Sequence, residues 1–232
     1  MKDALKTRFK ANYPFYSAYR FCRSCRAAAV RGLRTRLALI LRHIPASLRL
    51  RMIPTLRVCY GFQISARAVE CVRDRLTIGA NLLVFGLGRD SSTWELVNRN
   101  GRTVFLEDVP DWIQRSQAES PERESYLVKY STSVESSVGF SKASEIPRPN
   151  LPDNVALIGW DVVVVDGPEG WRPDKPGRAA SITLAGRLVA KGGVVLVDDY
   201  NRDVERYICD LVFGRVPDKI LDARRPVAVF HC

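Results

Sequence analysis

The stretch Asn81-Leu-Leu-Val-Phe-Gly-Leu-Gly88 decides the fold, because it is a short apolar run that ends in two closely spaced glycines. A second run, Trp160-Asp-Val-Val-Val-Val-Asp-Gly-Pro168, has the same form. Both runs are nearly continuous in apolar residues, which is typical of strands covered on both faces. The two stretches therefore predict buried strands of a parallel sheet, each closed by a turn.

Helix-compatible stretches alternate with the apolar runs along the chain. Further strands are expected at residues 103–106, 126–130, 194–197 and 227–230. Helices are expected at residues 64–76, 91–98, 177–189 and 203–213. This alternation is typical of parallel βαβ units and predicts an α/β fold with a Rossmann-like, mostly parallel sheet. The connection over residues 131–153 is long for a compact domain, and such loops are usually functional or mobile.

The charge of the chain is distributed unevenly. Residues 1–58 hold 14 of the 36 Lys and Arg residues but only one of the 25 acids, Asp3. We therefore predict a basic helical N-terminal extension, residues 1–58, followed by a Rossmann-like domain, residues 59–232. Such a segment favours contact with an anionic membrane surface or another polyanion. The alternative is a helix packed on the domain with a solvated basic face.

The sequence also bears on the compartment. The best candidate for a membrane span, residues 27–50, is interrupted by five arginines. A span needs about 20 nearly uncharged residues, so we expect no signal peptide and no transmembrane segment. We expect a cytoplasmic location, with peripheral attachment to a membrane as an option. The six cysteines follow no disulfide pattern, and Cys22-Arg-Ser-Cys25 has no second pair to complete a zinc site.

Glycine and acidic residues recur where the predicted strands end, which is where α/β sheets bind ligands. Gly86-Leu-Gly88 lets the backbone approach a ligand closely. Glu107 follows about twenty residues later, at the place of a ribose-binding acid. The pattern could serve NAD or S-adenosylmethionine. Ser91 stands where the third glycine of the dinucleotide-binding motif would be, which argues against NAD.

Two motifs make the resemblance to a known family specific. Phe85-Gly-Leu-Gly-Arg-Asp-Ser91, followed by Trp94, and Gly101-Arg-Thr-Val-Phe-Leu-Glu107, followed by Trp112-Ile113, resemble the plant glucuronoxylan 4-O-methyltransferase family, which includes irregular-xylem proteins. The second half of the chain also resembles this family, at residues 161–168, 176–178 and 197–202 and at Glu205. The similarity covers roughly residues 60–213. The chain departs from the plant pattern at its basic N-terminus, where plant members carry a Golgi membrane anchor.

The resemblance implies the fold of S-adenosylmethionine-dependent methyltransferases. It also implies transfer of a methyl group from S-adenosylmethionine to O-4 of a glucuronic acid residue in a glycan. The donor site would comprise Phe85, Gly86, Gly88, Ser91, Glu107, Asp166 and Gly167. The alternatives are a non-catalytic scaffold for polysaccharide assembly and an O-methyltransferase with a different small acceptor. We expect no nucleic-acid substrate, because the N-P-P-[YFW] motif of amino-methylating enzymes is absent.

The acids at the strand ends are the candidate catalytic residues, since a sugar hydroxyl must lose its proton when it is methylated. Asp166 or Asp198 could act as a general base. Alternatively, Asp166, Asp198 and Asp199 could hold a divalent cation, or one of them could simply cap a helix.

Three further side chains are candidates for binding the acceptor. Arg178 and Arg202 could lie at the rim of the site and bind a uronic acid carboxylate, or could pair with surface acids. Trp171 could support a sugar ring or anchor its loop.

Overall fold

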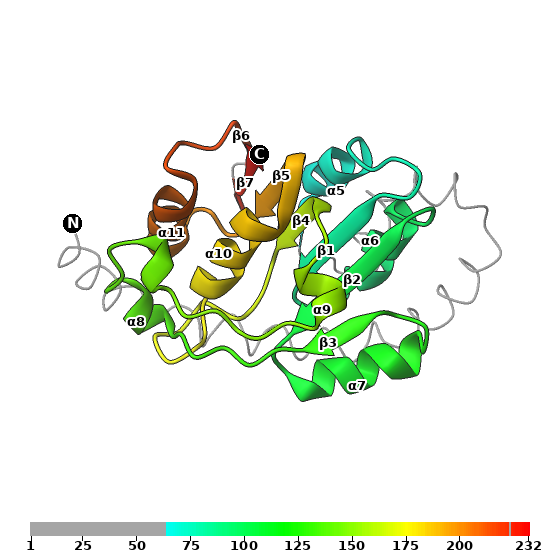
Figure 1. Ribbon diagram of the computed structural model, residues 1–232, viewed down its shortest axis with the longest axis horizontal. Coiled ribbons are helices and arrows are strands. Elements are labelled where there is room, and N and C mark those ends of the chain that lie inside the picture. Colours follow the sequence, from blue (N-terminus) through cyan, green and yellow to red (C-terminus); the bar gives the residue numbers. More distant parts are fainter. Residues whose placement is uncertain (1–63, 223) are drawn as a thin grey trace. The chain divides into compact units, whose positions relative to one another are not determined.

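The computed structural model describes residues 64–222 and 224–232 (Figure 1). The chain divides between Phe62 and Gln63 into two units, and the described residues belong to the second. The predictions for the basic extension, including the pair Cys22 and Cys25, lie outside the described residues. No helix in the described part is long and apolar enough to cross a membrane.

A seven-stranded sheet has the order β3-β2-β1-β4-β5-β7-β6. The strands are β1 Asn81–Phe85, β2 Arg102–Glu107, β3 Ser125–Leu127, β4 Trp160–Val165, β5 Val189–Val197, β6 Lys219–Leu221 and β7 Val227–His231. Strands β1 to β5 are parallel, whereas β7 runs antiparallel to both of its neighbours. This is a Rossmann-like α/β arrangement with a mostly parallel sheet, so the predicted fold class is confirmed.

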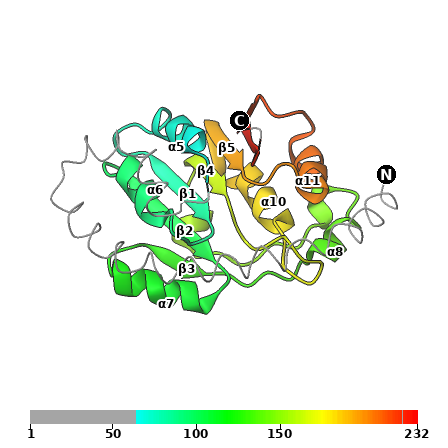
Figure 2. The ribbon, with the colours of Figure 1, turned by 180° about the vertical axis from the view of Figure 1, so that it is seen from behind.

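Helices cover both faces of the sheet. The longer ones are α5 Ala66–Arg73, α6 Ser91–Val97, α7 Pro110–Glu119, α10 Ala179–Leu188 and α11 Asp203–Phe213, and the short ones are α8 Val134–Ser137, η1 Ala143–Glu145 and α9 Asp153–Ala156. The chain crosses the sheet in one direction from β1 to β3 and in the other from β4 to β5. Because such crossovers are right-handed, α6 and α7 lie on one face and α10 on the other. Figures 1 and 2 show α10 beside α11, next to β4 and β5.

The core centres on β1 and β4, the two strands from which the fold was predicted. Every residue of Leu82–Phe85 and of Val162–Val165 is buried, because helices pack against both faces of these strands. Trp160 at the start of β4 is also buried, and its indole N–H donates to the Val155 carbonyl at 3.0 Å. The observed bounds of β1 and β4 match the predicted runs.

The structure differs from the predicted elements at four places. The strand predicted over residues 126–130 is shorter, because β3 spans only Ser125–Leu127. The helix predicted over residues 64–76 ends at Arg73, where the Asp74 N–H donates to the Glu70 and Val72 carbonyls. Strand β5 begins at Val189 instead of Val194, since Val189 pairs with Trp160. Strand β6, which was not predicted, contains only three residues, and two of them are exposed.

Candidate functional site

The loops that follow β1 and β4 meet backbone to backbone at two glycines. Gly86 has φ +106°, a conformation that side chains rarely adopt. A Cβ on Gly167 would lie 2.8 Å from Gly86 Cα, so only a glycine fits at Gly167. A Cβ on Gly88 would meet nothing within 4 Å, so the backbone faces open space there. This loop has the close approach and the open side that a nucleoside ligand needs.

Glu107, at the end of β2, ties the glycine loop to its neighbouring strand. One carboxylate oxygen accepts from the Leu87 N–H at 2.6 Å, and the other accepts from the N–H groups of Asp108 at 2.9 Å and Val109 at 2.8 Å. A carboxylate has about four acceptor positions, so one remains for a ribose hydroxyl. Burial of Glu107 raises its pKa to about 7. The predicted donor residue therefore also holds the loop in place.

Ser91 has a defined contact in the same loop. Its hydroxyl accepts from the Gly88 N–H at 3.0 Å, and the side chain is buried at the start of α6. Ser91, which replaces the third glycine of the dinucleotide-binding motif, thus holds the backbone of Gly88 in place. Phe85, the last residue of β1, is fully buried and contributes to the core.

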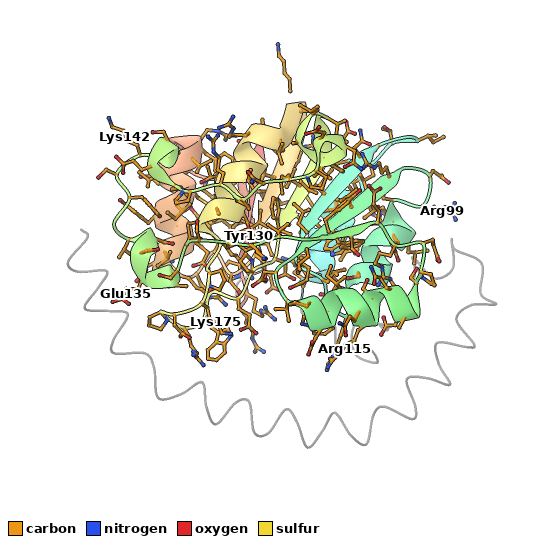
Figure 3. The ribbon with its side chains drawn as sticks, turned by 60° about the horizontal axis from the view of Figure 1, so that its bottom comes forward. Arg99, Arg115, Tyr130, Glu135, Lys142 and Lys175 are labelled. Atoms are coloured by element: carbon orange, nitrogen blue, oxygen red, sulfur yellow. The ribbon has the colours of Figure 1, made fainter. Side chains whose placement is uncertain are left out.

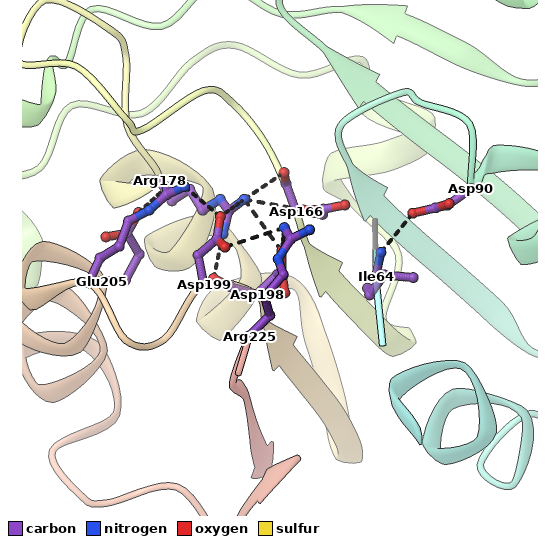
Figure 4. Close-up of polar contacts among 9 residues, drawn as sticks. Ile64, Asp90, Asp166, Arg178, Asp198, Asp199, Glu205 and Arg225 are labelled. Atoms are coloured by element: carbon purple, nitrogen blue, oxygen red, sulfur yellow. Dashed lines mark hydrogen bonds and ion pairs between the residues drawn. The ribbon is translucent and has the colours of Figure 1, made fainter. Parts of the chain in front are cut away.

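The predicted acids at the ends of β4 and β5 form one cluster around a buried arginine (Figure 4). Arg178 Nη2 lies 3.2 Å from Asp166 Oδ1, 3.1 Å from Asp199 Oδ2 and 3.9 Å from Asp198 Oδ2. Arg225 Nη2 lies 3.3 Å from Asp198 Oδ2 and 3.4 Å from Asp199 Oδ1. Arg202 also binds Asp199, so three carboxylates and three guanidiniums share the carboxyl edge of the sheet.

The three acids of this cluster differ in exposure and in pKa. The side chain of Asp166 is 25% exposed, whereas that of Asp198 is 1% exposed. Burial, together with the charge of Asp198, raises the pKa of Asp166 well above its usual range. Burial also disfavours the charged form of Asp199, but Arg178 and the neighbouring arginines outweigh it and lower the pKa of Asp199. Asp166 is therefore the most accessible acid of the cluster, and its pKa is raised.

Two further features mark the cluster as functional. Asp199 adopts φ 55°, a left-handed conformation that is uncommon outside glycine and that is concentrated at active sites. Asp198 Oδ1 and Arg178 Nε are buried and have no hydrogen-bond partner within the described residues. Buried unpaired polar atoms are rare in folded proteins, and a hydroxyl group can both donate to a carboxylate and accept from a guanidinium.

The structure contradicts the predicted place of Arg178 at the rim of the site. Its side chain is only 5% exposed and donates to the main-chain carbonyls of Asp166, at 2.9 Å, and Asp198. Arg202, 22% exposed, binds Asp199 at 2.6 Å and the buried Glu205 at 3.1 Å. Through these carbonyl contacts, Arg178 holds the ends of β4 and β5 together. Its charge can be buried because the carboxylates around it compensate it.

The cation and capping interpretations of the acids do not fit the structure either. The guanidinium of Arg178 lies among the three carboxylates, where a shared cation would have to bind. Over residues 64–222 and 224–232, no group of three or more His, Cys, Asp or Glu side chains could hold a metal ion. Helices α10 and α11 begin after Arg178 and Arg202, and no cap bond from Asp166, Asp198 or Asp199 occurs at either helix.

The loop after β4 is held by the long connection that precedes β4. The Val134 N–H donates to the Lys175 carbonyl at 2.8 Å, and the Glu135 N–H donates to the Pro173 carbonyl at 3.1 Å. Figure 3 labels Glu135 and Lys175, and shows Tyr130 near the centre of the same view. Trp171, on this loop, is half-buried, and the Arg172 guanidinium lies 5.3 Å from its ring centroid. Sugar binding by Trp171 stays a prediction.

Sequence reasoning missed two residues that contribute to the site. Asp90 is buried beside the glycine loop, and its carboxylate accepts from the Ile64 N–H at 3.0 Å. Its position immediately before a predicted helix was a sequence signal that could have identified it. Arg225 lies 27 residues after Asp198. Arg225 lies at the carboxyl edge of the sheet because β7, which follows it, pairs antiparallel with β5. No local sequence motif predicts this pairing.

A comparison with protein families decides the assignment. A model of the family described as IRX15/IRX15L/GXM matches residues 64–145 and 140–213, which include the glycine loop, Glu107 and the acids of the cluster. The chain belongs to this family. The resemblance stated from the sequence is thereby confirmed.

Curated relatives in the IRX15/IRX15L/GXM family come from Arabidopsis thaliana. Glucuronoxylan 4-O-methyltransferase 2 is 39% identical, and the match covers 54% of this chain and 50% of that protein. Glucuronoxylan 4-O-methyltransferase 1 is 35% identical over 54% of this chain and 52% of that protein. Arabinogalactan O-methyltransferase 2 is 29% identical over 62% of this chain and 58% of that protein. The chain thus spans about half the length of the curated relatives it matches.

Proposed function

We propose that this protein is an S-adenosylmethionine-dependent O-methyltransferase whose acceptor is a uronic acid residue of a glycan. The observation that carries the proposal is the convergence at one sheet edge of the glycine loop, Glu107 and the cluster of Asp166, Asp198 and Asp199. Membership of a family with relatives named as glucuronoxylan and arabinogalactan O-methyltransferases supports the same activity.

The donor would lie against the carboxyl ends of β1 and β2. Gly88 leaves room for it, Gly86 lets the β1 loop turn against Gly167, and the remaining acceptor position on Glu107 suits a ribose hydroxyl. Gly167 keeps the β4 loop close to this site, because a side chain there would push the two loops apart. S-Adenosylmethionine supplies a methyl group on a positively charged sulfur, which is already activated for transfer.

The protein must then align an acceptor hydroxyl with the methyl group and accept its proton. A bond forms between the acceptor oxygen and the methyl carbon while the carbon–sulfur bond breaks and its electron pair stays on sulfur. The hydroxyl proton passes to a base, for which we propose Asp166. It is the most exposed acid of the cluster, and its raised pKa makes it a stronger base than an ordinary aspartate.

Labelled S-adenosylmethionine and a panel of glucuronic acid glycans test this function. Label transferred to a uronic acid glycan, followed by mass spectrometry, supports it. Donor binding without transfer to any acceptor would favour the scaffold alternative. Transfer to a small acceptor lacking a uronic acid would favour the third interpretation.

Chelation tests the role of Asp166 as a direct base. Turnover that persists after exhaustive chelation supports it, because no cation is then needed to acidify the hydroxyl. Turnover that is lost and then restored by a divalent cation would contradict it and would require Arg178 to move from among the carboxylates.

We further propose that residues 1–58 bring the enzyme to an acidic surface, either a polyanionic acceptor or an anionic membrane, from a cytoplasmic location. Their composition supports this role, since basic residues outnumber acids fourteen to one in the segment.

A further inference from the structure

A uronic acid imposes a geometric condition on any enzyme that methylates its O-4. The hydroxyl and the carboxylate are carried by neighbouring parts of the ring, because O-4 is on C-4 and the carboxylate is attached to C-5. The base that receives the hydroxyl proton and the cation that binds the carboxylate must therefore lie close together, with no more than one side chain between them. A guanidinium is the best partner for the carboxylate, since it can donate two parallel hydrogen bonds.

Arg225 meets this condition. Its guanidinium contacts Asp198 at 3.3 Å, and Asp198 interacts in turn with Asp166, the proposed base. Figure 4 shows Arg225, Asp198 and Asp166 next to one another at the ends of β4 and β5. Only one acid side chain thus separates Arg225 from the base.

Exposure distinguishes Arg225 from the other arginines of the cluster. Its side chain is 40% exposed, compared with 22% for Arg202 and 5% for Arg178. Its contacts with Asp198 and Asp199, at 3.3 and 3.4 Å, are also longer than the 2.6 Å contact between Arg202 and Asp199. Arg225 is therefore the arginine of the cluster that is most accessible to an incoming anion.

We propose that Arg225 binds the carboxylate of the acceptor and thereby selects both a uronic acid and its O-4 hydroxyl. The inference rests on the proposed function and assigns to Arg225 the role that the sequence had suggested for Arg178 and Arg202. With the carboxylate on Arg225, the neighbouring O-4 hydroxyl is the one that reaches Asp166, whereas hydroxyls on the far side of the ring do not.

The test compares Arg225→Gln with the unaltered protein on two matched acceptors. One is a xylo-oligosaccharide bearing glucuronic acid, and the other is the same compound with its carboxylate converted to the neutral amide. The unaltered protein should prefer the carboxylate. Arg225→Gln should lose about tenfold or more in kcat/KM on the carboxylate acceptor, mainly through KM, as expected for a lost charged hydrogen bond. Its kcat/KM on the amide should change little.

Two further variants separate recognition from general damage. Arg225→Lys keeps the charge and should recover part of the preference. Arg224→Gln removes one positive charge from an exposed residue of the same connection and should behave as the unaltered protein does. Donor affinity, measured by calorimetry, should be equal in all four proteins.

The outcomes are distinct. If Arg225→Gln methylates but keeps the full preference for the carboxylate acceptor, the role of Arg225 is refuted while the proposed function stands. An equal loss on both acceptors would make Arg225 structural and would also refute the inference. If the unaltered protein binds the donor but methylates no uronic acid, the proposed function itself fails.

Discussion

Replacement of Glu107 by glutamine tests the donor site most sharply. Alanine would leave one buried and two part-buried N–H groups without their acceptor, at a cost of about 1–3 kcal/mol for each buried group, and so endanger the fold. Glutamine keeps one oxygen, which can still accept from the Asp108 and Val109 N–H groups. Its amide nitrogen then faces the Leu87 N–H and cannot accept from it. The glycine loop loses one tether, and the ribose loses a charged partner.

The expected effect on donor affinity is at least tenfold, because a hydrogen bond to a charged group contributes about 1.5–3 kcal/mol. It should also depend on pH. Because the pKa of Glu107 is about 7, the unaltered protein should bind the donor more weakly as the pH falls from about 8.5 to about 6, where the carboxyl group becomes protonated. Glu107→Gln should show no such dependence, and the two proteins should converge at low pH.

The same shift acts on stability in the opposite direction. The pKa of Glu107 is raised by burial, so its contribution to the free energy of unfolding is fully present below about 4.5 and is lost as the pH rises through about 7. A shift of this size corresponds to about 3 kcal/mol. Stability of the unaltered protein should therefore decrease as the pH rises from about 4.5 to about 7, whereas donor affinity should increase as the pH rises through about 7, and Glu107→Gln should flatten both trends.

Calorimetry with S-adenosylhomocysteine and thermal unfolding, both measured across this pH range, provide the assay. Donor affinity that is independent of pH in the unaltered protein would refute the proposed ribose contact. An identical pH dependence in Glu107→Gln would assign the titration to another group.

Two further predictions concern the base and the extension. Asp166→Asn should lower kcat by about 10²–10⁴-fold in single-turnover measurements while donor affinity changes little, and a kcat within a few-fold of normal would exclude Asp166 as the base. Deletion of residues 1–44 should raise KM for a polymeric acidic acceptor but not for a short oligosaccharide, with the difference fading as salt is added. A lower melting temperature and equal damage to both substrates would show instead that the segment packs on the domain.

The sequence predicted the elements whose environment is uniform along their length. Strands β1 and β4 are covered on both faces, so their apolar runs defined their bounds. The helix α11, from Asp203 to Phe213, was also placed correctly, because one of its faces is buried and Gly214 ends it in a left-handed conformation. Strand β6 was missed because two of its three residues face solvent and carry no pattern.

The sequence placed the acids of the site but not the depth of the arginines around them. The ends of parallel strands lie at one edge, so Glu107, Asp166 and Asp198 could be expected there from their order alone. Whether Arg178 lies at the rim or under the strand ends depends on how many carboxylates surround it, which only the folded chain reveals. Arg225 follows β6 in the sequence and reaches the site because β7 pairs antiparallel with β5. That pairing has no local sequence signature.

The position of the transferred methyl group tests the central claim most directly. The protein is incubated with isotopically labelled S-adenosylmethionine and a xylo-oligosaccharide bearing glucuronic acid, and the product is examined by NMR and mass spectrometry. We predict one labelled methyl group, on O-4 of the glucuronic acid, with one S-adenosylhomocysteine formed for each methyl transferred. A glycan that stays unmethylated while the donor is bound, or a methyl group on any other oxygen, would contradict the account.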